Sequence, residues 1–136
     1  MRNMIVVLVE VFVLVLFSES CRDHENKNGM HEILYINNKS GMDLYFEIVD
    51  CDTLMSGYNF LKDNSFLIKD NERTKMYKRG GYEQSIKFCS RFCILFFDAS
   101  LKSIPFDTVW KHEMFDYRKI YTLDQLDSLD WTITVP

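Results

Sequence analysis

The sequence predicts a mainly β fold, a small antiparallel β-sandwich with one or two short helices, and three observations support this. Residues 42–48 alternate apolar and polar side chains, the period of two that a half-buried strand requires. Residues 92–97 form a continuous apolar run, which is typical of a strand in the middle of a sheet. The chain is 15% aromatic and holds only two prolines, which favours a packed β domain over a disordered segment.

The first residues of the chain have the order of a secretory signal. A basic start is followed by an apolar run from Met4 to Phe17 and then by small residues before Cys21. This run of 14 residues is shorter than the roughly 20 that a helix needs to cross about 30 Å of hydrocarbon. A permanent transmembrane anchor is therefore the weaker interpretation.

Cys21 decides which kind of signal this is. A bacterial lipoprotein signal ends at an invariant cysteine, and Ser20 suits the position before it, whereas Ser18 and Glu19 depart from the usual pattern. We predict a signal peptide at residues 1–20 and lipidation of Cys21, with plain secretion as the alternative. Acyl chains then hold the protein to a membrane without spanning it, since each buried methylene contributes about 0.8 kcal/mol.

The part of the chain after the signal divides into a tether and one domain. Residues 21–31 are polar and lack apolar periodicity, so we expect a flexible tether that begins at the lipidated cysteine. Residues 32–136 form a single β-rich domain. Residues 1–20 hold one of the 16 basic and two of the 20 acidic residues, so the remaining 116 residues carry a formal charge of −3. Without a basic block, nucleic acid is excluded as a partner.

The elements of the domain follow in order along the chain. An apolar run at 32–37 and the alternating segment 42–49 are joined by a turn signal, Asn37 to Gly41, and together they predict a β-hairpin. Further along, the pattern predicts a weak strand at 66–69, a turn at 70–72, an alternating strand at 74–79, the apolar strand at 92–97, a short helix at 106–113 and a strand at 118–123.

The C-terminal residues predict a helix and a closing strand. Thr122 and Gln125 have the spacing of a capping box, and three leucines at 123, 126 and 129 share one helical face. Residues 131–135 alternate as a strand whose odd-numbered side chains share one side. Pro136 suits a strand terminus because it cannot donate to a sheet ladder.

The cysteines after Cys21 predict little chemistry. Cys51, Cys89 and Cys93 are odd in number, so an exported chain keeps at least one thiol or forms a bond between molecules. Cys89 and Cys93 can pair only if the chain turns between them, because they lie about 13 Å apart along a continuous strand. We expect a buried thiol at Cys93, and no metal site.

No catalytic residues and no cofactor are predicted. The segment Asp50-Cys-Asp-Thr53 resembles the start of a phosphatase motif, but no βαβ alternation follows it. None of the histidines, at 24, 31 and 112, can be placed beside a nucleophile, and we expect His112 to be solvated. Several aromatic residues in mixed-polarity stretches are candidates for stacking on sugars or anchoring a partner protein: Tyr77, Tyr82, Trp110, Phe115 and Tyr117.

Three segments carry a resemblance to a known family. Residues 121–136 (YTLDQLDSLDWTITVP), 94–101 (ILFFDASL) and 79–85 (RGGYEQS) resemble small uncharacterised lipoproteins of Bacteroides-type bacteria. Those proteins end in a Thr-Leu-x-x-Leu helix and a Trp-Thr-Ile-Thr-Tyr-Pro strand; here Val135 replaces the tyrosine, and Tyr82 stands where tryptophan is common. The resemblance implies lipidation at Cys21 and no specific activity.

These observations predict an exported, lipid-anchored protein of the bacterial outer membrane, facing the periplasm or the surface. Its expected function is non-enzymatic binding, or an accessory role in an envelope complex, with an envelope protein or a glycan as partner. A small hydrolase acting on an envelope or glycan substrate is the alternative. Thr53 follows Asp52 in a motif that resembles the O-glycosylation site of the same bacteria, and it is the copy at which we expect modification.

Overall fold

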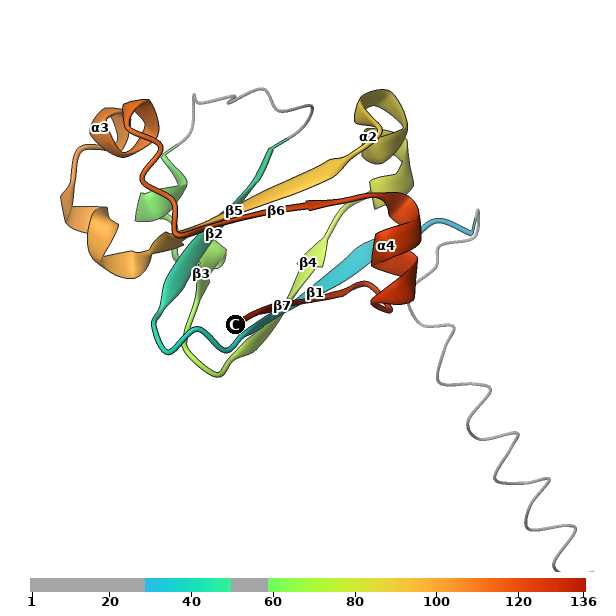
Figure 1. Ribbon diagram of the computed structural model, residues 1–136, viewed down its shortest axis with the longest axis horizontal. Coiled ribbons are helices and arrows are strands. Elements are labelled where there is room, and N and C mark those ends of the chain that lie inside the picture. Colours follow the sequence, from blue (N-terminus) through green and yellow to red (C-terminus); the bar gives the residue numbers. More distant parts are fainter. Residues whose placement is uncertain (1–28, 50–58) are drawn as a thin grey trace, which may run out of the picture.

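The computed structural model describes residues 29–49 and 59–136, which form two packed sheets and three short helices (Figure 1). The strands are β1 (Ile33–Asn38), β2 (Leu44–Val49), β3 (Leu67–Ile68), β4 (Arg73–Tyr77), β5 (Phe92–Asp98), β6 (Tyr117–Tyr121) and β7 (Thr132–Val135). The helices are α2 (Tyr82–Cys89), α3 (Phe106–Lys111) and α4 (Leu123–Ser128), with 3-10 turns η1 (Phe60–Lys62), η2 (Asn64–Phe66) and η3 (Ala99–Ser103). The predicted mainly β sandwich is confirmed.

The strand order is β4-β1-β7 in one sheet and β3-β2-β5-β6 in the other. Strand β5 lies between β2 and β6, as its continuous apolar sequence predicts. All neighbouring strands are antiparallel except β1 and β7, which are parallel. The sandwich is therefore mostly antiparallel, whereas the sequence predicted a wholly antiparallel one. Helix α4 returns the chain to the end of the molecule where β1 begins, and β7 therefore runs in the same direction as β1 (Figure 1).

The predicted hairpin of β1 and β2 is wrong, because the two strands belong to different sheets. The chain turns a corner between the sheets at Asn38, a fully buried polar residue. Its Nδ2 donates to the carbonyl oxygens of Met42 at 2.7 Å and Ile68 at 3.2 Å. Its Oδ1 accepts from the Ser40 N–H at 3.1 Å and from the Ser40 hydroxyl at 2.7 Å. The side chain is thus satisfied in the core, and the turn signal marks a corner rather than a hairpin.

Two apolar clusters hold the fold together. The first lies between the sheets and includes the buried side chains of Leu34, Ile36, Ile94 and Ile133. The second covers the outer face of the four-stranded sheet, where η1, η3 and α3 pack (Figure 1). Each such apolar side chain contributes about 1.5–3 kcal/mol when fully buried. Because β5 is buried on both faces, it links the two clusters.

Helices α3 and α4 lie where the sequence predicts helices. The capping box of α4 is present, with the Gln125 N–H donating to Thr122 Oγ1 at 3.3 Å and the Thr122 N–H donating to Gln125 Oε1 at 2.9 Å. Leu126 is buried, but Leu129 is 43% exposed because the helix ends before it. Helix α2 was not predicted.

Candidate functional site

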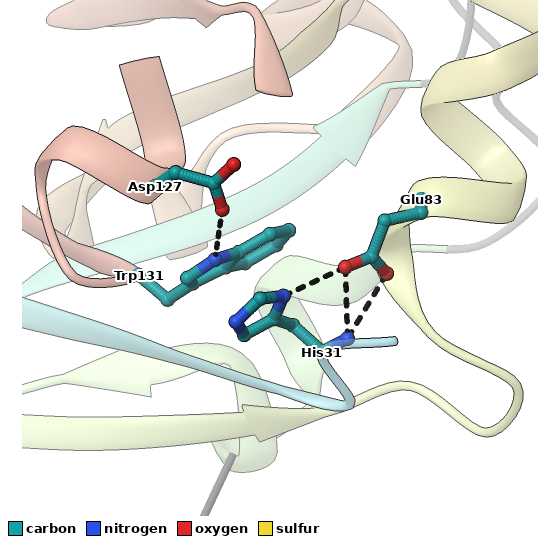
Figure 2. Close-up of polar contacts among 4 residues, drawn as sticks. All are labelled: His31, Glu83, Asp127 and Trp131. Atoms are coloured by element: carbon teal, nitrogen blue, oxygen red, sulfur yellow. Dashed lines mark hydrogen bonds and ion pairs between the residues drawn. The ribbon is translucent and has the colours of Figure 1, made fainter. Parts of the chain in front are cut away.

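A cluster of four side chains lies where the described chain enters the domain (Figure 2). We call this set, His31, Glu83, Asp127 and Trp131, the N-terminal clasp. The His31 ring stacks on the Trp131 indole, with ring centroids 4.2 Å apart and an angle of 16° between the planes. His31 Nδ1 lies 2.7 Å from Glu83 Oε1, and the indole N–H donates to Asp127 Oδ1 at 2.8 Å.

The Glu83 carboxylate binds the backbone N–H of His31 as well as its imidazole ring. The His31 N–H donates to Glu83 Oε1 at 2.9 Å and to Oε2 at 3.1 Å. The approach of the two segments requires Gly81, which has a φ of +88°. A Cβ at Gly81 would lie 2.6 Å from the Met30 Cβ and 2.9 Å from Glu83 Oε2. A glycine is therefore needed here both for its backbone conformation and for the space it leaves.

Trp131 is fixed by an unusual backbone conformation. Its φ is +51° and that of Asp130 is +48°, in the left-handed region that costs a bulky residue roughly 1–2 kcal/mol. The Trp131 N–H donates to the Leu126 carbonyl at 2.9 Å, and its own carbonyl accepts from the Tyr35 N–H at 2.8 Å. These bonds and the burial of the indole, which is 2% exposed, hold the ring beneath His31.

The clasp attaches the start of the described chain to the domain. An imidazole beside a carboxylate can relay a proton when a third group presents one. Here the indole covers one face of the imidazole, and the Glu83 carboxylate also binds the His31 backbone. The geometry thus fixes the position of His31, which the sequence had placed at the end of the tether. His31 and Glu83 are 52 residues apart, and no local pattern joins them.

A second candidate is the outer face of the three-stranded sheet, which we call the open sheet face. Inward-facing residues of β1, β4 and β7 pack in the first cluster, and their neighbours point outward. The outward residues are Ile33, Tyr35 and Asn37 on β1, Arg73, Lys75 and Tyr77 on β4, and Thr132 and Thr134 on β7. In Figure 1 the helices lie at the ends of the sandwich and beside the other sheet, and none of the described elements lies over this face.

The strand register arranges these side chains in rows. Tyr35 lies between Lys75 and Thr132, and Asn37 lies between Arg73 and Thr134. Arg73 places its guanidinium carbon 4.0 Å from the centroid of the Tyr35 ring. Such stacking contributes about 0.5–1 kcal/mol at an exposed site and limits the motion of the guanidinium.

Tyr77 is the most exposed aromatic residue of the open sheet face, at 68%. Its hydroxyl donates to Glu32 Oε2 at 3.1 Å, and this hydrogen bond to a carboxylate raises the pKa of Tyr77. Glu32 lies at the edge of the face, where its other oxygen accepts from the Gly80 N–H at 3.2 Å. The remaining charges of the face are those of Arg73 and Lys75, so it is positive.

Among the carboxyl groups in the described part of the chain, Glu47 has the largest shift in pKa. It lies on β2 opposite Leu95 of β5, on the face that the second cluster covers, and the next residue in that row is Arg118 of β6. Burial raises the pKa of Glu47 from 4.5 to about 7. Sequence alternation placed Glu47 on a solvent face, but both faces of β2 are covered.

Some sites predicted from the sequence lie outside the described residues. These are the signal peptide, lipidation at Cys21, the cysteine at 51 and O-glycosylation at Thr53. Cys93 is a buried thiol, as predicted. Cys89 is disulfide-bonded, and since Cys93 is not in a disulfide, the partner of Cys89 lies outside the described residues.

The other predicted candidates divide by exposure. His112 is exposed at the end of α3, as predicted. Of the aromatic candidates, Tyr77 is exposed, whereas Tyr82 is buried in the first cluster. The other three, Trp110, Phe115 and Tyr117, are half-buried against the clusters. The sequence pattern therefore identified one residue of the open sheet face, Tyr77. It did not identify the others, because only the strand register brings them together.

Within residues 29–49 and 59–136, no group of three or more His, Cys, Asp or Glu side chains is placed to hold a metal ion. The same residues contain no helix that is both long and apolar enough to cross a membrane. Comparison of the chain with protein-family models, with curated proteins and with solved structures finds no match in any of the three.

Proposed function

We propose that this chain is an exported, lipid-anchored protein of the bacterial outer membrane that acts by binding a partner through its open sheet face. The apolar run, the small residues and Cys21 support the anchor, as does the resemblance of residues 79–136 to small lipoproteins. Such a protein is attached to the membrane by acyl chains and faces the periplasm or the surface.

The disulfide at Cys89 supports export. Disulfides form and persist in oxidising compartments such as the periplasm and the cell surface, and they are rare in the cytosol. A cysteine that is disulfide-bonded in the folded domain is therefore typical of a protein that has left the cytosol.

The observation that carries the binding function is the open sheet face itself. On the outer face of this sheet an exposed tyrosine, an arginine stacked on a second tyrosine, and a lysine lie together. Tyr and Arg are the residue types enriched where proteins bind partners. Arg73 and Lys75 form no ion pair with another described residue, so their positive charges can attract a partner of negative charge.

The anchor is tested by the intact mass of the N-terminal peptide from membranes of a bacterial host with lipoprotein processing. We expect a peptide that begins at acylated Cys21 and that is absent from a Cys21→Ala variant. An unprocessed N-terminus, or cleavage elsewhere without lipid, would refute the anchor.

A small hydrolase acting on an envelope or glycan substrate is the second candidate, and Glu47 is the observation that favours it. A carboxyl with a pKa of about 7 can give and take a proton near neutral pH, as a general acid or base must. The hydrolase predicts that purified chain releases fragments from envelope polysaccharide and that Glu47→Gln abolishes the release. No release by the wild-type chain would refute the hydrolase, and equal release by both proteins would refute the role of Glu47.

A further inference from the structure

The size of the open sheet face limits what it can bind. Three strands spaced about 4.8 Å apart, with rows spanning five residues at about 3.3 Å each, make a surface roughly 15 Å on a side. A standard protein–protein interface buries about 800 Å² on each partner, several times this area. The face therefore suits a narrow, extended partner lying along the strands better than a globular one.

The charge of the face indicates the chemistry of that partner. Arg73 is held against the Tyr35 ring, so its planar guanidinium is already ordered before binding. A guanidinium donates two parallel hydrogen bonds to one carboxylate, with the strength and geometry of a charge-assisted pair. Lys75 is next on the same strand face and supplies a second cation. Together they suit carboxylate groups repeated along a chain.

The uncharged side chains complete the surface. Asn37 and Thr134 offer an amide and a hydroxyl group beside the cations, which can pair with the hydroxyl groups of a sugar. The Thr132 hydroxyl donates to the Asp130 carbonyl at 3.2 Å and can still accept a hydrogen bond. The Tyr77 ring is exposed, and the bond from its hydroxyl to Glu32 limits its motion. An ordered aromatic ring of this kind packs against the C–H face of a sugar ring.

From this combination we infer that the open sheet face binds a linear polysaccharide whose sugars carry carboxylate groups. The inference rests on the proposed function, because it names the partner class of the same surface. A second copy of this chain is a poorer partner, since two such faces would bring two arginines and two lysines together. An acidic protein would satisfy the cations but needs more area than the face provides.

The test uses the full-length chain, purified from membranes in detergent, and two carboxylated polymers, polygalacturonate and alginate. Fully methyl-esterified polygalacturonate is the control polymer because it has the same backbone without the charges. Binding is measured by isothermal titration calorimetry at about 0.15 M salt, where long-range attraction is screened. We expect saturable binding of at least one acidic polymer and binding of the ester that is at least about tenfold weaker.

Matched variants separate the face from net charge. Arg73→Gln with Lys75→Gln removes two positive charges from the face, and Lys102→Gln with Lys111→Gln removes two from exposed positions on η3 and α3. We expect the first pair to weaken binding at least about tenfold and the second to change it less than twofold. Tyr77→Ala should weaken binding roughly threefold to tenfold through lost ring packing.

Three results would overturn the inference. These are no binding of either acidic polymer, equal binding of the methyl ester, and equal weakening by the two double variants. Binding of an acidic protein that is lost with Arg73→Gln and Lys75→Gln, without polymer binding, would overturn the polysaccharide and leave the proposed binding face standing. An N-terminal peptide without lipid would refute the anchor independently of all these measurements.

Discussion

Replacing Glu47 with Gln should remove a pH dependence from the stability of the protein. The amide has nearly the same shape as the carboxyl group but does not titrate. In the folded chain burial raises the pKa of Glu47 from 4.5 to about 7, so the folded state binds this proton more tightly than the unfolded state does. The free energy of unfolding therefore falls as the pH rises from about 4.5 to about 7, and this loss persists at higher pH.

The size of the effect follows from the pKa difference. Each tenfold change in proton affinity is worth about 1.4 kcal/mol, so a pKa change from 4.5 to about 7 sets an upper limit of about 3 kcal/mol. Glu47 is only half-buried and solvent screens part of this, which leaves an expected loss of about 1–2 kcal/mol. The Glu47→Gln variant should therefore gain about that much stability over the wild type between pH 4.5 and pH 8.

Urea unfolding at several pH values, with the disulfide intact, measures the difference between wild type and variant. Taking this difference cancels the titration of every other group. Glu113→Gln is the matched control because Glu113 is exposed, and its difference from the wild type should stay within about 0.5 kcal/mol at all pH values. A Glu47→Gln difference that is flat from pH 4.5 to pH 8 would refute the argument that burial controls this carboxyl group.

Three further predictions concern the clasp and the disulfide. Gly81→Ala should cost about 1–3 kcal/mol more than Gly41→Ala, because both have positive φ but only the first meets atoms within 3 Å; equal losses in thermal unfolding would contradict the close approach. His31→Ala removes the stacking and the ring contact with Glu83, so amide hydrogen exchange at the start of β1 should accelerate about tenfold, and an unchanged rate would show that the clasp does not hold it. Non-reducing peptide mapping should pair Cys89 with Cys51, because acylation would occupy the sulfur of Cys21 in the proposed lipoprotein; a link from Cys89 to Cys21 would argue against the lipid.

Much of the fold is predictable because several elements are specified locally. Strand β5 has apolar side chains on both faces, and the capping box of α4 lies within four consecutive residues. Helix α2 was missed because only Tyr82 and Ile86 are buried, which is too few to make an apolar stripe. The false hairpin has a different cause, since Asn38 bonds to a carbonyl 30 residues away, and this contact distinguishes a corner from a hairpin.

The candidate site was harder to predict than the fold. The alternation in β4 indicates a polar outer face, but it cannot show that β1 lies between β4 and β7. Only the register places Tyr35 between Lys75 and Thr132. The clasp depends likewise on contacts between distant residues, because His31 meets a helix 52 residues further along the chain.

The position of β1 has a mechanical consequence for a chain anchored through Cys21. Any pull between membrane and domain enters the fold at the N-terminal end of β1, the middle strand of its sheet. Hydrogen bonds to β4 and β7 run across the strand, so a pull along its axis loads both ladders in shear and all their bonds share the tension. An edge strand peeled from its sheet would instead lose its bonds one at a time. In such an anchored chain, the middle strand β1 would therefore resist drag on a polymer bound at the open sheet face.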